Sequence, residues 1–265
     1  LGHEFVGIVE QADDAAWQGQ RVVGDINAAC GWCATCVTGR PTHCPERTTL
    51  GIEGRDGALA DLFCLPETNL HHVPPTIPDE AAVFVEPLAA ACEVLEQVHV
   101  EPSERVVVLG DGKLGLLVAQ VLALTGCELT VVGRHEEKLA ILAKNGIHTL
   151  LSDASGSLAG ADMVVECTGQ AAGFQEARRL VRPRGTLVLK STYHGTVETD
   201  LSGLVVDEIH VVGSRCGPFP PALRLLEQEL VDVASLIEAE YGLDQAMEAL
   251  EHAGSRGSLK VLIRP

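Results

Sequence analysis

Aromatic and basic residues are scarce in this sequence. Phe, Trp and Tyr make up 3% of the 265 residues, and 19 Lys and Arg stand against 37 Asp and Glu, which gives a net charge of −18. A protein this acidic repels the phosphate backbone of DNA or RNA, so we expect no nucleic-acid partner. The acidic residues are spread along the chain, which favours a well-hydrated surface over an acidic interaction arm.

Long hydrophobic runs are also absent. No apolar stretch reaches the roughly 18 to 20 residues of a membrane-spanning helix, and no charged-then-apolar signal peptide opens the chain. Hydrophobic residues nevertheless make up 46% of the sequence, enough to form the buried cores of two domains. We therefore expect a folded cytoplasmic protein with no membrane partner.

The nine cysteines are unevenly distributed. Four lie within fifteen positions, with the spacing C-x2-C-x2-C-x7-C, and the other five are scattered through apolar or strand-like stretches. This pattern favours metal binding in a reducing compartment over a disulfide framework. Four thiolates can complete a tetrahedral shell that leaves no open position, so the spacing predicts a structural zinc site. The predicted ligands are Cys30, Cys33, Cys36 and Cys44.

Two alternatives remain for these four cysteines. They could be unrelated buried or redox-active thiols, although free cysteines rarely cluster without a ligand or a redox task. They could also belong to a zinc module that binds nucleic acid. The acidic balance of the chain and the domain that follows weigh against that second alternative.

Hydrophobic patterning divides the chain into three segments. Residues 1 to about 75 are rich in Gly, Pro and short β-branched runs, which is typical of a small β-domain. From about residue 101, continuous apolar strands alternate with helix-like stretches, which indicates an α/β fold with a parallel sheet covered on both faces. We expect domains at 1–97 and 98–216, with 217–265 returning to the first domain.

A glycine-rich motif follows the first strand of the alternating region. The sequence Gly-Asp-Gly-Lys-Leu-Gly at 110–115 comes directly after the apolar run 106–109 and before a helix predicted over 114–124. Its three glycines permit a tight turn, close approach of a pyrophosphate and close packing of the helix on the strand. Alone the motif is weak, but in this context it predicts a dinucleotide whose phosphates meet the helix N-terminus. The predicted contacts are Gly110, Gly112, Lys113, Leu114 and Gly115.

The next predicted strand, 129–132, ends without an acidic residue. An NAD-binding protein would usually place Asp or Glu there for the ribose hydroxyls. Gly133 followed by Arg134 leaves room for a 2′-phosphate and offers it a bidentate cationic partner, so the sequence favours NADP over NAD. The alternative is that Arg134 faces solvent and that Glu136 or Glu137 reaches the ribose.

Two short motifs are candidates for a catalytic metal site. His3 and Glu4 lie side by side between glycines, and Glu86 lies shortly before the dinucleotide-binding segment. His and Glu are suitable ligands for a catalytic zinc that keeps one position for substrate. The residues alone leave another interpretation open, in which His3 is a hydrogen-bonded structural residue and Glu86-Pro87 starts a helix.

Together these motifs resemble those of the zinc-dependent medium-chain dehydrogenases, the family of alcohol, sorbitol and threonine dehydrogenases. The order and spacing of Gly2 to Gly7, the four-cysteine loop, Glu86-Pro87-Leu88 and the glycine motif agree over nearly the whole chain. The resemblance implies a Rossmann-type doubly wound parallel sheet inserted into a GroES-like β-rich catalytic domain. It also implies hydride transfer between a secondary alcohol or polyol and NAD(P), a small-molecule alcohol or carbonyl substrate, and a homodimer or homotetramer.

The resemblance further implies roles for individual residues. His3 and Glu86 match ligands of a catalytic zinc, Glu4 a neighbouring glutamate that can approach the metal, and Thr168-Gly169 a segment that passes the nicotinamide ribose. The four cysteines match the family's structural zinc lobe. The family's catalytic cysteine and its proton-relay Ser or Thr precede the Gly-His-Glu motif. This chain begins at that motif, so we expect its first domain to be truncated at the N-terminus.

Two other functions remain open. One is a zinc-free quinone or enone reductase on the same fold, although the cysteine lobe and the pair His3 and Glu86 speak against it. The other is a non-catalytic nucleotide-binding or assembly protein.

Overall fold

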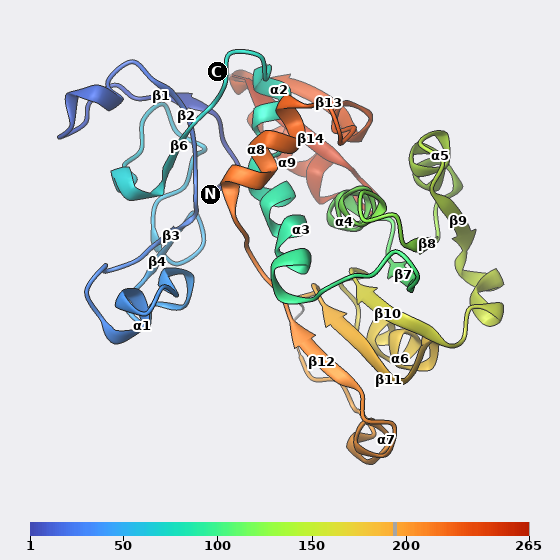
Figure 1. Ribbon diagram of the computed structural model, residues 1–265. Coiled ribbons are helices and arrows are strands. Elements are labelled where there is room, and N and C mark those ends of the chain that lie inside the picture. Colours follow the sequence, from blue (N-terminus) through green and yellow to red (C-terminus); the bar gives the residue numbers. More distant parts are fainter. Residues whose placement is uncertain (193–194, 265) are drawn as a thin grey trace. The chain divides into compact units, whose positions relative to one another are not determined.

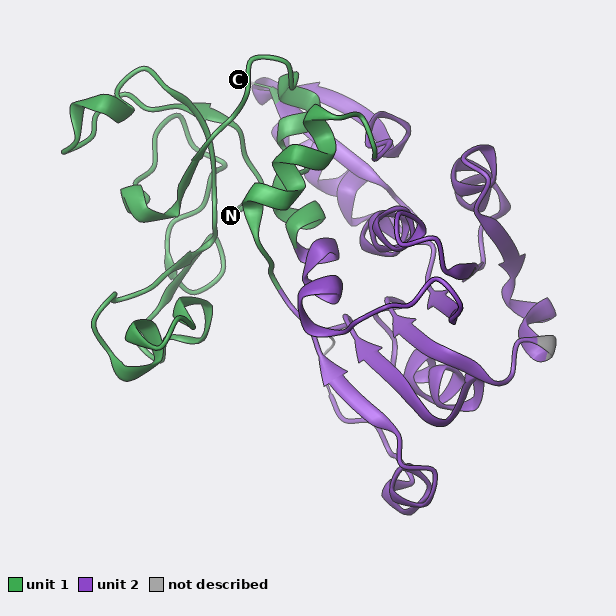
Figure 2. Cartoon of the chain, viewed as in Figure 1, with its two compact units in different colours: residues 1–89, 216–230, 264–265 green, residues 90–215, 231–263 purple. Residues whose placement is uncertain are grey.

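The chain divides into two compact units. The computed structural model describes residues 1–192 and 195–264; Tyr193, His194 and Pro265, which fall within the expected domains, lie outside this description (Figure 1). Unit 1 contains residues 1–89 and 216–230 together with Arg264, and unit 2 contains residues 90–215 and 231–263 (Figure 2). No helix among the described residues is both long enough and apolar enough to cross a membrane.

Unit 1 is built from short strands joined by long turns. Its first sheet is antiparallel with the order β1-β2-β6, and its second has the order β3-β4-β5. The central strand of the first sheet buries Val22 and Val23. The strands are β1 (Gly7–Ile8), β2 (Arg21–Gly24), β3 (Asn27–Ala28), β4 (Thr48–Leu50), β5 (Gly54–Arg55) and β6 (Leu70–His72). The α-helices are α1 (Ala34–Val37), α2 (Asp79–Ala82) and α8 (Phe219–Glu227), and α3 (Val85–Gln97) begins here.

Unit 2 contains a six-stranded parallel sheet with the order β12-β11-β10-β7-β8-β9. Its strands are β7 (Arg105–Leu109), β8 (Glu128–Gly133), β9 (His148–Leu151), β10 (Ala161–Glu166), β11 (Val181–Leu189) and β12 (His210–Gly213). The helices between and after them are α4 (Lys113–Ala123), α5 (Glu136–Lys144), α6 (Ala171–Leu180), α7 (Leu201–Val206) and α9 (Ala246–Gly254). A separate pair of strands is formed by β13 (Ile237–Gly242) and β14 (Lys260–Arg264). Short 3-10 helices lie at Ala15–Trp17, Pro41–His43, Glu67–Asn69, Ser152–Ser157, Ala234–Leu236 and Leu243–Gln245.

The strand order reverses between β7 and β10. From β7 the chain proceeds to β8 and β9 on one side, and then returns to β10, β11 and β12 on the other. In open parallel sheets of this kind, ligands bind outside the carboxyl ends of the strands at the point of reversal. The predicted fold class, a doubly wound parallel sheet combined with a β-rich domain, is confirmed.

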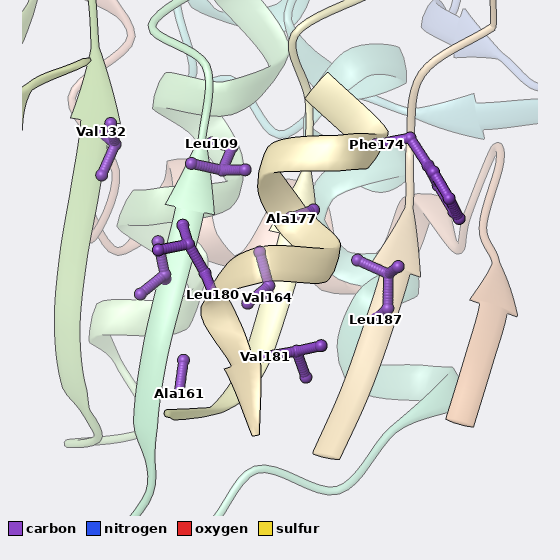
Figure 3. Packing of buried hydrophobic residues seen from close by; sticks show 10 residues of the cluster. Leu109, Val132, Ala161, Val164, Phe174, Ala177, Leu180, Val181 and Leu187 are labelled. Atoms are coloured by element: carbon purple, nitrogen blue, oxygen red, sulfur yellow. The ribbon is translucent and has the colours of Figure 1, made fainter. Parts of the chain in front are cut away.

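The core of unit 2 forms where α6 packs on the sheet. Phe174, Ala177 and Leu180 recur every three residues and therefore lie on one face of the helix. Figure 3 shows this face against side chains of the sheet, among them Val164 and Leu187, which are fully buried. This packing fixes β10, and Thr168 and Gly169 follow shortly after its C-terminal end.

The C-terminal segment is shared between the units, whereas the sequence led us to expect all of 217–265 in the first domain. Phe219 stacks on His71 with ring centroids 4.9 Å apart, which ties α8 to unit 1. Residues 231–263 instead group with unit 2. There Gln120 of α4 donates to the backbone oxygen of Asp232 (3.1 Å) and accepts from its N–H (2.7 Å). This pair of hydrogen bonds depends on the folded sheet and has no local sequence signature.

Candidate functional site

The four predicted zinc ligands converge in one loop of unit 1. Cys30 follows β3, and Cys33 directly precedes α1. Cys36 lies within α1, and Cys44 follows a 3-10 turn. Sulfur–sulfur distances are 3.5 Å for Cys33–Cys36 and Cys30–Cys44, 3.8 Å for Cys33–Cys44 and 3.9 Å for Cys30–Cys36. A tetrahedral site with zinc–sulfur bonds of about 2.3 Å has sulfur–sulfur edges of about 3.8 Å. The four sulfurs therefore fit a zinc ion and leave no position for substrate.

Backbone N–H groups are directed at several of these sulfurs. The N–H of Cys36 is the main cause that lowers the pKa of the Cys33 thiol to about 7. Burial outweighs a similar N–H contact from Gly31 and raises the pKa of Cys36 to about 12. Without a cation, only part of the cluster would be ionised, so binding of a divalent metal would release protons.

His3, Glu4 and Glu86 form a second cluster in unit 1. Each offers one ligand atom, these atoms lie within 4.8 Å of one another, and all three residues are half-buried. Glu86 lies in the first turn of α3, beside the fully buried Val85 and Leu88. One imidazole nitrogen with two carboxylate oxygens is a donor set that suits a zinc ion with room for a substrate.

The N-terminal segment that carries His3 is held by its neighbours. The N–H of Ala58 donates to the carbonyl of Gly2 (2.9 Å), and the N–H of Leu59 donates to that of Leu1 (3.0 Å). A Cβ on Gly51 would lie 2.2 Å from the Gly2 carbonyl oxygen, so only glycine fits there. These contacts hold the backbone next to His3 against residues 51–59.

In unit 2, the glycine motif links β7 to α4 and has the shape of a phosphate cradle. Gly110 has φ of +116°, and a Cβ on it would lie 2.7 Å from the carbonyl oxygen of Cys167. A Cβ on Gly115 would lie 2.1 Å from the carbonyl oxygen of Gly110, which explains the close packing of helix on turn. Gly112, by contrast, faces open space at the N-terminus of α4, with no side chain capping the helix. The uncapped N–H groups at this helix N-terminus and the helix dipole suit a pyrophosphate.

Other predicted cofactor residues in unit 2 lie in the first turn of α4 and shortly after β10. Lys113 is exposed and Leu114 is half-buried in the first turn of α4. Thr168 follows β10, and its N–H donates to the buried carboxylate of Glu166 (2.7 Å). Gly169 has φ of +68° and donates its N–H to the hydroxyl of Ser191 (2.8 Å). The segment is therefore held in a defined conformation.

An acidic side chain from the glycine motif reaches the end of β8, which the sequence did not reveal. Asp111, the second residue of the glycine motif, is 7% exposed and accepts from the N–H groups of Arg134 and His135, each at 2.6 Å. The side chain of Arg134 is exposed. The sequence does show an Asp in place of a small residue between the first two glycines of the motif. The N–H groups that this Asp binds, however, lie more than twenty residues further along the chain.

Comparisons with known families match most of the chain. Residues 1–75 match the family described as the alcohol dehydrogenase GroES-like domain. Residues 114–231 match the family described as zinc-binding dehydrogenase. The first match contains His3, Glu4 and the four clustered cysteines, and the second begins within the glycine motif, at Leu114.

Individual relatives cover the whole of this chain. A sorbitol dehydrogenase of Halalkalibacterium halodurans is 29% identical over 100% of the chain and 83% of its own length. An erythritol/L-threitol dehydrogenase of Mycolicibacterium smegmatis is 28% identical over 100% of the chain and 79% of its own length. Among solved structures, a protein assigned as a zinc-binding dehydrogenase from Sinorhizobium meliloti, bound to NADP, aligns with a TM-score of 0.90 and 28% identity over 100% of this chain and 83% of that one.

Proposed function

We propose that the chain is a member of the zinc-dependent medium-chain dehydrogenases and that it transfers hydride between a secondary alcohol or polyol and a nicotinamide dinucleotide. The relatives named as sorbitol and erythritol/L-threitol dehydrogenases support a polyol as the substrate class. The product of the forward reaction is then the corresponding carbonyl compound.

Two zinc ions are proposed for the chain, with different tasks. Cys30, Cys33, Cys36 and Cys44 would hold one as a closed structural site. His3 and Glu86 would hold the other, with Glu4 beside them. A zinc ion with an open position supplies a Lewis acid that makes the hydroxyl proton of an alcohol easier to remove.

The residues of unit 2 would bind the dinucleotide. The open side of Gly112 and the N-terminus of α4 accommodate the pyrophosphate, and the ordered Thr168–Gly169 segment would pass the nicotinamide ribose. A nicotinamide held there would supply the acceptor or donor of the hydride. For the choice of dinucleotide, Arg134 supports NADP, whereas the carboxylate of Asp111 opposes a second anion at the same strand end.

The His3, Glu4 and Glu86 cluster carries the catalytic part of this proposal. A zinc-free reductase or a nucleotide-binding assembly protein would have no need of three metal-binding side chains converging within 4.8 Å in addition to a closed sulfur site. Because neither alternative explains the second cluster, we favour the dehydrogenase.

Metal analysis of the purified protein tests the proposal. We expect two zinc ions per chain in the unmodified protein, and one zinc ion per chain in each of the variants Glu86→Gln and Cys36→Ser. We also expect the unmodified protein to reduce a dinucleotide when a polyol is supplied. Only Glu86→Gln should abolish this activity while the fold stays intact. One zinc in the unmodified protein, insensitive to Glu86→Gln, would favour the binding protein. Reduction of a quinone or enone that is unaffected by Glu86→Gln would favour the zinc-free reductase chemistry. The expected homodimer or homotetramer is tested by light scattering of the same sample.

A further inference from the structure

The carboxylate of Asp111 lies at the end of β8, a strand that itself ends without an acidic residue. Asp111 is the second residue of the glycine motif, yet its carboxylate reaches the end of β8, the strand whose tip normally carries the acid that binds the adenosine ribose. Oδ2 accepts from the N–H groups of Arg134 and His135 at 2.6 Å and contacts Nδ1 of His135 at 3.0 Å. The loop and the strand end are thus joined by one charged group.

Only part of this carboxylate is engaged. Within the described chain, hydrogen bonds are made by Oδ2, whereas Oδ1 makes none and is not fully buried. The side chain of Asp111 as a whole is 10% exposed. An oxygen that is held in place and still reaches solvent can accept a hydrogen bond from a ligand hydroxyl.

The position of Asp111 also explains why residue 133 is a glycine. The backbone of Gly133 is extended as part of β8, so no left-handed conformation requires a glycine there. A Cβ at this position would instead lie 2.6 Å from both Cβ and Oδ2 of Asp111. The space beside Gly133, which the sequence suggested for a 2′-phosphate, is filled by the carboxylate.

We propose that Asp111 is the residue that selects the dinucleotide: it accepts a hydrogen bond from the 2′-hydroxyl of the adenosine ribose and repels a 2′-phosphate, so that the protein prefers NAD to NADP. The inference rests on the proposed function, because it concerns the cofactor of that reaction. It reverses the preference suggested by Gly133 and Arg134.

The guanidinium of Arg134 does not offset this repulsion. Arg134 is exposed, so water screens its guanidinium, and a 2′-phosphate could not use the Arg134 and His135 N–H groups that Asp111 occupies. Lys138 on α5 is buried, and its positive charge contributes to the lowered pKa of Glu238. Glu136 and Glu137, which follow in the first turn of α5, add further negative charge.

Dinucleotide binding tests the proposal without relying on turnover. Fluorescence titration of the zinc-loaded protein with NADH and NADPH should give a dissociation constant for NADH at least about tenfold smaller, because a 2′-phosphate and Asp111 repel each other at close range. Asp111→Asn, which keeps the shape and removes the charge, should shift the NADH-to-NADPH ratio toward NADPH by about tenfold. Asp162→Asn is the matched control: Asp162 also accepts a backbone N–H, from Arg105 at 2.7 Å, but at the opposite end of the sheet, and its loss should leave the ratio unchanged.

Two further measurements keep the test decisive if Asp111→Asn does not fold. Calorimetry on the unmodified protein should show tighter binding of 5′-AMP than of adenosine 2′,5′-bisphosphate. Arg134→Ala, a surface change, should alter NADPH affinity less than about threefold. Three results would overturn the inference without contradicting the proposed dehydrogenase function. They are tighter binding of NADPH than of NADH, an unchanged NADH-to-NADPH ratio in Asp111→Asn, and a loss of NADPH affinity of more than about tenfold in Arg134→Ala. Absence of binding for both dinucleotides would remove the inference and the proposed cofactor together.

Discussion

Replacing Gly133 with alanine should destabilise unit 2, although alanine is normally the better residue. At an extended position such as this one, Gly→Ala lowers the entropy of the unfolded chain and usually stabilises a protein by about 0.4–1 kcal/mol. Here the added methyl would lie 2.6 Å from Cβ and Oδ2 of Asp111, closer than side-chain atoms approach. The sign of the effect therefore tests whether Asp111 occupies this space.

The expected size follows from what the methyl displaces. Overpacking alone costs about 1–3 kcal/mol. Moving the Asp111 carboxylate also weakens its bonds to the N–H groups of Arg134 and His135, and hydrogen bonds to a charged group contribute about 1.5–3 kcal/mol each. Partial relaxation keeps the total below the full sum, so we expect Gly133→Ala to lower the free energy of unfolding of unit 2 by about 2–4 kcal/mol.

Native-state hydrogen exchange of the buried amides of β7 and β10 measures this free energy for unit 2 separately from unit 1. The control is a double-mutant cycle with Asp111→Ala. Once the carboxylate is gone, adding Gly133→Ala should cost less than about 1 kcal/mol, which gives a large coupling energy between the two positions. A stabilising Gly133→Ala, or equal costs with and without Asp111, would refute the placement of this side chain.

Three more predictions concern charge, core and metal. Burial raises the pKa of Asp111, but the N–H groups of His135 and Arg134 outweigh it and hold the pKa below its usual range. The stability gained is present above the unfolded pKa of about 3.9 and is lost as the pH falls through the lower folded pKa, so acid unfolding curves of Asp111→Asn should be flatter below pH 4 than those of the unmodified protein. Leu180→Ala removes a fully buried side chain from the core of unit 2 and should cost about 2–5 kcal/mol, whereas a loss below 1 kcal/mol in thermal melting would contradict the packing of α6. Cys36→Ser should remove one zinc per chain by mass spectrometry, while Cys64→Ser, which changes an exposed thiol outside the cluster, should remove none.

Features encoded within a few consecutive residues could be predicted from the sequence. The spacing of the four cysteines brings their sulfurs together because the loop is short, and the glycine motif sets the turn between β7 and α4 by its own conformation. The helix predicted over 114–124 is observed at Lys113–Ala123. In each case the determining interactions lie close together in the chain.

Features that depend on the tertiary arrangement could not be predicted. Asp111 reaches residues 23 and 24 positions away, so nothing in its local sequence shows that it fills the space beside Gly133. The hydrogen bonds between Gln120 and Asp232 span 112 positions and hold the start of the segment 231–263 in unit 2. Convergence of His3 and Glu86 was suggested by the family resemblance and not by their spacing.

The two metal-binding clusters differ in how far apart their members lie along the chain. The outermost sulfur ligands, Cys30 and Cys44, are 14 positions apart, so closing this loop requires little ordering and a metal ion can bind it early during synthesis. His3 and Glu86 meet only after more than eighty residues have folded around them. If both clusters bind zinc as proposed, we expect metal loading to be ordered in time: the sulfur cluster could fill before unit 1 has folded, whereas the histidine–carboxylate cluster forms only once unit 1 has folded.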